Sequence, residues 1–423
     1  MTFNPDHKDF WDESQVEGEL KRVSDICNGC RRCYNLCPSF NDLFARLDQE
    51  SVDGDAEKLG SKDFRSVTDL CYQCKLCFNH CPYTPPHRWE IDFPRLMFRS
   101  KAVQVKRDGQ SLQDRVLGQV DRVGHLSSFL APLVNWANRN RFNRWLVEKF
   151  LGIHRDRLLP AYAAETFQQW YDRRRPSHPP AEAGKAALFY TCSVNYNDPP
   201  VGKACVGVLE KNRIEVACPE QRCCGMPFLD GGDIEAARAN ARANVESLYP
   251  LVKQGYDIVV PGPTCSYVLK RDYPLLLSGE EVGVVAGRVF DICEYLMALH
   301  GRQKLDTGFV KGAGRVAYQI PCHLRAQNIG YKSRDLMELL PNTTVRLIEK
   351  CSAVDGTWGL KQQYFDLSMK VAEPLLREIR ETESDLTVSD CPLSALQIKQ
   401  GTGRQPLHPV QILEMAYGLD GKR

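Results

Sequence analysis

The chain has 423 residues, of which 43% are hydrophobic and 26% are charged, and this length allows two to four domains with a substantial core. The 55 Lys and Arg residues nearly balance the 53 Asp and Glu residues, and a net charge of +2 gives no basis for nucleic-acid binding. The charged opening, 1–22, lacks the apolar core of a secretory signal, and no run of 18 apolar residues predicts a transmembrane helix. We therefore expect a cytoplasmic protein whose 18 cysteines stay reduced.

Two runs of four cysteines, each followed by proline, lie near the start of the chain. They are Cys27, Cys30, Cys33 and Cys37 before Pro38, and Cys71, Cys74, Cys77 and Cys81 before Pro82. Both follow the pattern C-x2-C-x2-C-x3-C-P, which holds [4Fe–4S] clusters in bacterial two-cluster ferredoxins. Three thiolates two residues apart can reach three corners of one small cube from a tight loop, while the fourth points away.

The ligands of the two clusters are expected to be exchanged between the runs, because the fourth cysteine of each ferredoxin run ligates the other cluster. One cluster would be held by Cys27, Cys30, Cys33 and Cys81, and the other by Cys71, Cys74, Cys77 and Cys37. Zinc is the alternative metal. Structural zinc sites, however, use two separated C-x2-C pairs rather than two runs of four that end in proline.

The segment between the runs predicts a larger domain than a minimal ferredoxin. Thirty-three residues separate the two runs, and 41–50 has a helical pattern, as does the region after the second run. We predict a mostly helical ferredoxin-like domain over 1–100 that binds two [4Fe–4S] clusters.

Residues 101–185 form a helical linker region in which aromatic and basic residues are interleaved. Within it, Trp136, Phe142, Trp145, Phe150 and Leu151 lie among Arg139, Arg141, Arg144 and Lys149. Helices that lie on a membrane surface have this composition. Packing on the protein itself or on a partner subunit is the more common use of an amphipathic helix. The Pro-rich, charged stretch 171–185 predicts a domain boundary.

From residue 186 onward, short β-strand patterns alternate with helices, which predicts α/β structure. Five strand patterns end in cysteine: 186–192, 257–265, 315–322, 344–351 and 386–391. Because α/β folds place their sites at the carboxyl ends of strands, these cysteines are expected to gather there.

The cysteines of this region repeat. Cys192, the pair Cys223–Cys224 and Cys265 form the first copy, and Cys322, Cys351 and Cys391 form the second. The gaps are 31 and 41 residues in the first copy and 29 and 40 in the second, and CCGMPFLDGG aligns with CSAVDGTWG. We predict two α/β domains, 186–312 and 313–423, so that the whole chain is an α+β multidomain protein.

These motifs identify the chain as similar to the CCG-domain iron–sulfur proteins, the heterodisulfide-reductase-B-like family. The order of one ferredoxin domain and two CCG domains resembles that in the C-type iron–sulfur subunits of anaerobic glycerol-3-phosphate dehydrogenase, and more loosely that in the iron–sulfur subunit of glycolate oxidase. The segments APLVNWA, YTCSVNYNDPPVGK, CCGMP and IPCHL contribute to the resemblance, which covers nearly the whole chain.

The resemblance implies a third iron–sulfur centre, held by Cys192, Cys223, Cys224 and Cys265. Heterodisulfide-reductase relatives use a C-x-x-C at the last position and five thiolates for a non-cubane cluster. Here the fifth position is Val268, so four thiolates would hold an ordinary cluster. The alternative is a group of four buried free thiols.

The second copy has fewer potential ligands, because Ser352 and Ser394 replace two cysteines. Three interpretations of Cys322, Cys351 and Cys391 stay open: a [3Fe–4S] centre, a cube with a non-thiolate fourth ligand, or a vestigial site. His323 and Asp355 lie nearby in sequence, and His323 is a candidate ligand, hydrogen-bond donor or structural histidine. Cys205, Cys218 and Cys293 lie outside the repeat and are expected to be core residues.

The leading functional hypothesis is a subunit that transfers electrons between a flavoprotein dehydrogenase and a quinone or other acceptor. The family supplies this expectation, and the sequence contains no flavin- or nicotinamide-binding motif of its own. The expected location is cytoplasmic, with peripheral attachment to the inner face of the membrane. Two alternatives are an enzyme that reduces disulfides at the CCG cluster and a redox or recruitment partner of a peroxide-scavenging system.

Overall fold

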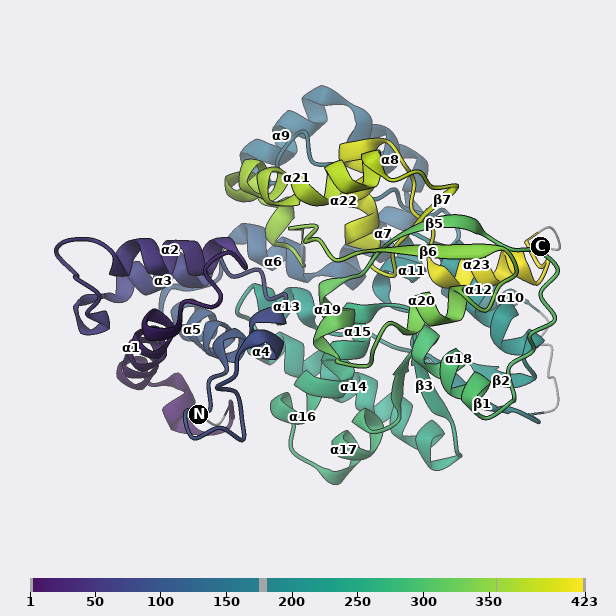
Figure 1. The fold of residues 1–423 in the computed structure, drawn as a ribbon, viewed down its shortest axis with the longest axis horizontal. Helices are drawn as coiled ribbons and strands as arrows, with labels where there is room; N and C mark the ends of the chain where they lie inside the picture. Colours follow the sequence, from purple (N-terminus) through teal and green to yellow (C-terminus); the bar gives the residue numbers. More distant parts are fainter. Residues whose placement is uncertain (1–2, 175–180, 355, 421–423) are drawn as a thin grey trace.

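A computed structural model describes residues 3–174, 181–354 and 356–420. An all-helical N-terminal domain, purple in Figure 1, lies beside a larger α/β body that contains two parallel sheets. Part of the predicted boundary at 171–185, namely 175–180, lies outside the described residues, as does Asp355. The α+β class with a helical first domain and two α/β units is confirmed.

The N-terminal domain is built from five α-helices and two short 3-10 turns. They are η1 (Lys8–Trp11), α1 (Glu13–Cys30), α2 (Pro38–Leu47), η2 (Ala56–Lys58), α3 (Ser61–Asp69), α4 (Leu76–His80) and α5 (Phe93–Asp108). Their apolar faces form one core that includes Phe40, Leu43 and Phe44. Pro38 fits the first position of α2, where its missing N–H is not needed.

The first cysteine run differs from the expected tight loop, because Cys27 and Cys30 lie within the last turns of α1. Asp12 starts this helix by accepting from the backbone N–H groups of Ser14 and Gln15 at 2.9 and 3.1 Å. The helix ends at Arg31, whose φ of 49° is left-handed. Buried residues spaced three or four apart on α1 extend the helix as far as the cysteines.

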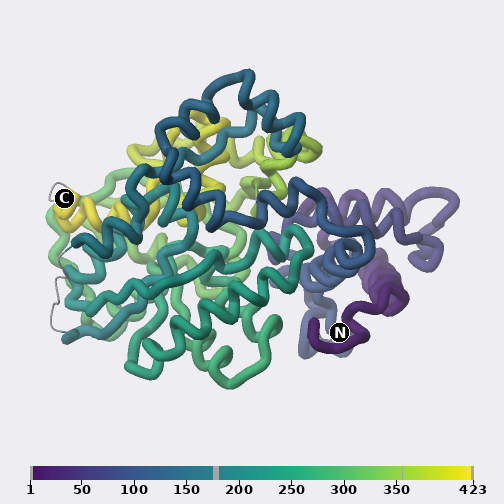
Figure 2. The backbone as a smooth tube through the Cα atoms, turned by 180° about the vertical axis from the view of Figure 1, so that it is seen from behind, coloured from purple at the N-terminus to yellow at the C-terminus, as the bar shows by residue number. Residues whose placement is uncertain are grey.

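The linker region is helical, as predicted. It contains α6 (Leu112–Gly118), α7 (Val120–Phe129), α8 (Ala131–Arg139), α9 (Arg141–Leu151) and α10 (Phe167–Arg173). Figure 2 shows α6 to α9 as a blue tube that passes over the α/β body and rises to its top. None of the described helices is long and apolar enough to cross a membrane.

The first α/β unit contains a four-stranded parallel sheet in the order β2-β1-β3-β4. Its strands are β1 (Gly184–Leu188), β2 (Ile214–Ala217), β3 (Asp257–Val260) and β4 (Val289–Asp291). Its helices are α11 (Cys192–Tyr196), α12 (Pro199–Lys211), α13 (Met226–Asp230), α14 (Ile234–Lys253), α15 (Pro263–Tyr267), η3 (Val268–Asp272), α16 (Tyr273–Leu276), α17 (Glu280–Ala286) and α18 (Ile292–Gly301). The sequence predicted β1 and β3 but missed the short strands β2 and β4.

The second unit contains a three-stranded parallel sheet in the order β6-β5-β7, and all three strands were predicted. The strands are β5 (Gly314–Gln319), β6 (Thr343–Ile348) and β7 (Leu386–Val388). The helices are α19 (Cys322–Ala326), α20 (Lys332–Met337), η4 (Trp358–Leu360), η5 (Gln362–Tyr364), α21 (Phe365–Glu381), α22 (Pro392–Thr402) and α23 (Pro409–Ala416). Within the described residues this sheet has no strand equivalent to β4.

The start of α23 gives a prediction about pH. His408 caps this helix by accepting from the Val410 N–H at 3.1 Å, and burial lowers the pKa of His408 to about 3. The unfolded chain therefore binds more protons below its own His pKa of about 6.5, so stability is lost as pH falls from there. In urea unfolding, His408→Asn should flatten this acid-side slope, by up to about 1.4 kcal/mol per pH unit. An unchanged slope would contradict a neutral His408.

Candidate metal centres

The first cysteine group combines three residues of the first run with the last residue of the second. Burial raises the pKa of Cys27 to about 12, and the thiols of Cys33, Cys81 and Cys30 raise it further. All four line one hollow of about 330 Å³ whose other walls include the apolar side chains of Ile26, Phe40, Phe44 and Ile91. We call Cys27, Cys30, Cys33 and Cys81 the first ferredoxin set.

The second group has the reciprocal composition. Burial raises the pKa of Cys37 to about 12, and the nearest thiol acting on it is that of Cys71. Burial also raises the pKa of Cys77, to which Cys74, Cys71 and Cys37 contribute in that order. We call Cys37, Cys71, Cys74 and Cys77 the second ferredoxin set. The structure therefore brings the fourth cysteine of each run to the other run.

The third group lies at the carboxyl end of the first sheet. Cys192 begins α11 just after β1, Cys265 lies in α15 just after β3, and the pair Cys223–Cys224 follows β2. The chain turns after the pair at Gly225, whose φ of 98° favours glycine. We call Cys192, Cys223, Cys224 and Cys265 the first CCG set.

The thiols of the first CCG set form a chain of hydrogen bonds. Cys192 bonds with Cys223, Cys223 with Cys224, and Cys224 with Cys265. The hydrogen bonds from Cys192 and Cys224 lower the pKa of Cys223, while the hydrogen bonds and burial raise the pKa of Cys192 and Cys224. Four sulfurs in mutual contact form a compact soft-donor site.

An acidic side chain from the linker region reaches this set, which the sequence did not predict. The Cys223 N–H donates to Asp121 Oδ2 of α7 at 2.7 Å. Burial raises the pKa of Asp121 to about 6, and the Cys223 thiol adds to the effect. The two residues are 102 positions apart, and no motif joins them, so only the fold could reveal the contact.

The second CCG set, Cys322, Cys351 and Cys391, follows the three strands of the second sheet. The two serines that replace cysteines meet each other, since Ser394 Oγ lies 2.9 Å from Ser352 Oγ and both residues are buried. Tyr72, next to Cys71, places its hydroxyl 3.4 Å from Cys351 Sγ. This degenerate site therefore lies against the second ferredoxin set.

His323 joins three parts of the chain. Its Nε2 donates to the Gln73 carbonyl at 2.8 Å, and its Nδ1 lies 2.8 Å from the Thr264 hydroxyl. Gln73 precedes Cys74, Thr264 precedes Cys265, and His323 itself follows Cys322. Because both ring nitrogens are engaged and the side chain is only 1% exposed, His323 connects the sets instead of offering a nitrogen to a metal.

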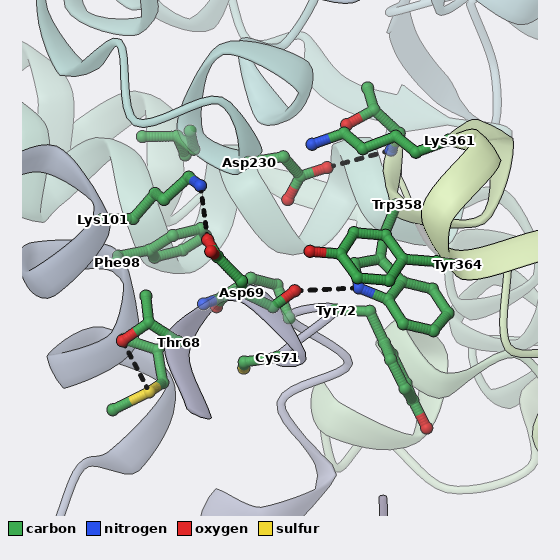
Figure 3. Close-up of a pocket in the computed structure, with 14 residues that line it drawn as sticks. Thr68, Asp69, Cys71, Tyr72, Phe98, Lys101, Asp230, Trp358, Lys361 and Tyr364 are labelled. Carbon is green, nitrogen blue, oxygen red and sulfur yellow. Dashed lines mark hydrogen bonds and ion pairs between the residues drawn. The ribbon is translucent and has the colours of Figure 1, made fainter. Parts of the chain in front are cut away.

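A hollow of about 430 Å³ lies where the ferredoxin domain meets both α/β units (Figure 3). Tyr72, Trp358 and Tyr364 form an aromatic wall in which the rings of Trp358 and Tyr364 stack at 4.6 Å. The Trp358 indole N–H donates to the Asp69 carbonyl at 3.0 Å, and Lys101 pairs with the Asp69 carboxylate at 2.7 Å. These contacts hold the segment before Cys71 against the second unit.

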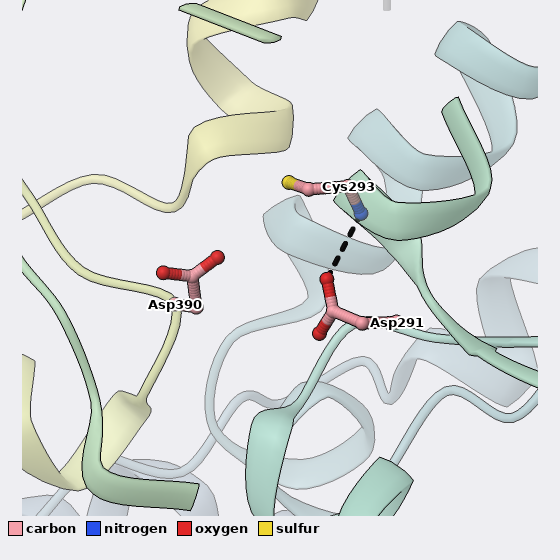
Figure 4. Close-up of side chains that lie close together, drawn as sticks. All are labelled: Asp291, Cys293 and Asp390. Carbon is pink, nitrogen blue, oxygen red and sulfur yellow. Dashed lines mark hydrogen bonds between the residues drawn. The ribbon is translucent and has the colours of Figure 1, made fainter. Parts of the chain in front are cut away.

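The three cysteines outside the repeat lie apart from these sets. Cys205 and Cys293 are fully buried in an apolar cluster, and Cys218 packs against the same cluster. Cys293 also lies near the buried carboxylates of Asp291 and Asp390 (Figure 4), and Asp291 accepts from the Cys293 N–H at 2.9 Å. Burial beside Asp390 raises the pKa of Asp291, which favours its protonated form.

The donor sets fit iron–sulfur groups. All 18 cysteines are free, and the ferredoxin and first CCG sets each gather four thiols in buried or half-buried positions. Burial alone disfavours the thiolate form of these groups, whereas iron bound to sulfur would compensate the charge. Soft thiolates in groups of four are the ligands of [4Fe–4S] clusters.

Two protein-family models match the chain. The Citrate utilization protein B Fer4-like domain matches 20–107, and the Cysteine-rich (CCG) domain matches 186–270 and 316–399. The chain is thus an iron–sulfur protein that joins a ferredoxin-like domain to two cysteine-rich domains.

Curated relatives define the family further. The C-type component of anaerobic glycerol-3-phosphate dehydrogenase from Escherichia coli K12 is 31% identical over 72% of this chain and 77% of its own length. This chain belongs to that family, as its motifs predicted. The B-type component of fumarate reductase (CoM/CoB) from Methanothermobacter marburgensis is 29% identical over 56% of this chain and 47% of its own. Lactate utilization protein A 2 from Bacillus cereus is 23% identical over 56% of this chain and 97% of its own.

Proposed function

We propose that this chain is the electron-transfer subunit of an oxidoreductase complex, with three iron–sulfur centres held by the two ferredoxin sets and the first CCG set. The observation that carries the proposal is the position of His323, which hydrogen-bonds beside Cys74 on one side and beside Cys265 on the other. The second ferredoxin set and the first CCG set are thus joined by two hydrogen bonds through one buried ring.

When bound, a cluster of this kind supplies one-electron transfer without a proton. The chain's own residues hold the thiolates and exclude water. Apolar side chains such as Phe40 and Phe44 surround the first ferredoxin set, and Tyr72 closes the second on the side of Cys351. The second CCG set, with two serines in place of cysteines, receives no centre in this assignment.

A flavoprotein dehydrogenase subunit is the proposed electron donor or acceptor on one side, and a quinone on the other. Support comes from the names of the relatives, which are subunits of a dehydrogenase and a reductase. The chain adds no flavin or nicotinamide motif of its own, so the dehydrogenase chemistry is assigned to a partner.

The exchanged ligands give a prediction. In Cys37→Ser, the centre associated with the second run should be lost or altered, while the signal of the first run persists. The reason is that Cys37 faces Cys71 and Cys77 rather than its own run. Electron paramagnetic resonance (EPR) spectra of Cys37→Ser and Cys81→Ser should therefore differ in which signal disappears. Loss of the first-run signal in Cys37→Ser would contradict the exchange.

Catalysis provides the test of the proposed role. The purified chain, loaded with iron and sulfide and reduced by a dye, should pass electrons to menadione but should not turn over small disulfides. A four-thiolate site without a fifth cysteine at Val268 supports this expectation. Disulfide turnover without any partner subunit would favour the disulfide-reducing alternative.

A further inference from the structure

The linker helices carry most of the exposed apolar surface of the described chain. Of its eleven exposed large hydrophobic residues, nine belong to 112–150. They are Leu112, Leu126, Phe129, Leu130, Leu133, Trp136, Phe142, Trp145 and Phe150. Phe129 is 82% exposed and Phe150 68%, so the aromatic rings of α7 and α9 project from the protein. We call these nine residues the apolar surface.

The charges around the apolar surface all have one sign. The exposed charged residues of 112–151 are Arg115, Arg122, Arg139, Arg141 and Lys149. The three acidic residues of this stretch are held by the protein: Asp114 pairs with Lys361 at 2.5 Å, Asp121 accepts from Cys223, and Glu148 is bound by Arg155. The solvent-facing side is therefore apolar and cationic without a competing exposed carboxylate.

An anionic lipid bilayer is the partner that matches this chemistry. Amphipathic helices with Trp, Phe and Leu beside Arg and Lys lie in the headgroup region of a bilayer. Each cation near an anionic surface adds roughly 1 kcal/mol of attraction. The stacked rings of Phe142 and Trp145, with Lys149 above the indole, provide an aromatic and basic contact suited to that interface.

The opposite face of α7 packs on the first CCG set. Asp121 accepts from the Cys223 N–H, and Gly124 lies so close to Tyr196 that an added Cβ would come within 2.3 Å of its ring. One turn later, Ser127 hydrogen-bonds with Tyr162. Because Tyr196 is in α11, the helix that begins at Cys192, one face of α7 contacts the cysteine site, while Leu126 and Phe129 on its other face are exposed.

We propose that the apolar surface docks on anionic lipid and that Asp121 couples this docking to the reduction potential of the centre at the first CCG set. The proposal rests on the proposed third centre. Lipid would displace water from the outer face of α7, and the Asp121 charge would then act more strongly on the centre beneath it. The added negative potential disfavours an extra electron, so docking should make this centre harder to reduce.

The test is an EPR-monitored redox titration of the loaded chain at pH 8, with and without phosphatidylglycerol–phosphatidylethanolamine vesicles. Vesicles should shift the signal of the first CCG set, identified by its loss in Cys224→Ala, to more negative potential and leave the ferredoxin signals in place. Asp121→Asn should bind vesicles normally but lose the shift. Asp257→Asn, at the opposite end of β3, is the matched control and should keep it.

Vesicle flotation measures docking separately. Phe129→Ser with Leu133→Ser should lower vesicle binding at least about tenfold, since two apolar side chains leave the bilayer. Val310→Ser, which removes an equally exposed residue outside the apolar surface, should bind normally. Absent vesicle binding, or binding with no shift in the wild type, would overturn the proposal. An iron count that lacks a third centre would instead refute the proposed function on which it rests.

Discussion

Replacing Cys224 with alanine will lower the iron content by about four atoms per chain and leave both ferredoxin signals intact. Cys224 bonds with both Cys223 and Cys265, so its loss divides the first CCG set into separate parts. The ferredoxin sets lie in another domain with its own core and should not respond. Iron and sulfide analysis with EPR of the reduced protein measures both effects.

Cys205→Ala is the matched control for that variant. Cys205 is fully buried and lies in the same α/β unit, but it packs in the apolar cluster on α12 rather than in a cysteine set. Its replacement should keep the wild-type iron content. An unchanged iron content in Cys224→Ala would mean that the first CCG set binds no cluster through this residue.

Replacing His323 with alanine will keep the iron but slow electron transfer from the ferredoxin sets to the first CCG set. The variant removes both 2.8 Å hydrogen bonds and leaves the buried Gln73 carbonyl and Thr264 hydroxyl without this partner. Leaving a buried polar group unsatisfied costs about 1–3 kcal/mol, so urea unfolding should show a loss of at least that size. Freeze-quench EPR after reduction measures when the signal of the first CCG set appears.

His323→Gln separates the two effects, because its amide can still donate to Gln73 but cannot bridge the same two partners in the ring's geometry. It should regain part of the stability and less of the rate. Wild-type transfer in His323→Ala, with intact iron, would show that electrons pass by another route.

The ferredoxin part of the account was predictable from spacing. The two Cys-Pro runs specified both the helical first domain and the grouping of Cys81 with Cys27 that the structure shows. The CCG repeat likewise led to cysteines at the ends of parallel strands. Strands β2 and β4 escaped prediction because four and three residues are too short for a periodic pattern to be distinguished.

The contacts that connect the sets could not be predicted from the sequence. Asp121 meets Cys223 across 102 residues, and His323 meets Gln73 across 250. Such pairs carry no periodicity or motif, and they arise only when separate domains pack together. The linker helices were ambiguous for a related reason: their composition suits both packing and lipid, and in the structure α7 has one face on the protein and the other exposed.

The most direct test of the central claim is the iron and acid-labile sulfide content of the anaerobically loaded wild-type chain, together with its EPR spectrum after reduction. Three centres predict about twelve irons and a third signal beyond the ferredoxin pair. About eight irons, with only the two ferredoxin signals, would contradict the claim that the first CCG set extends the electron path.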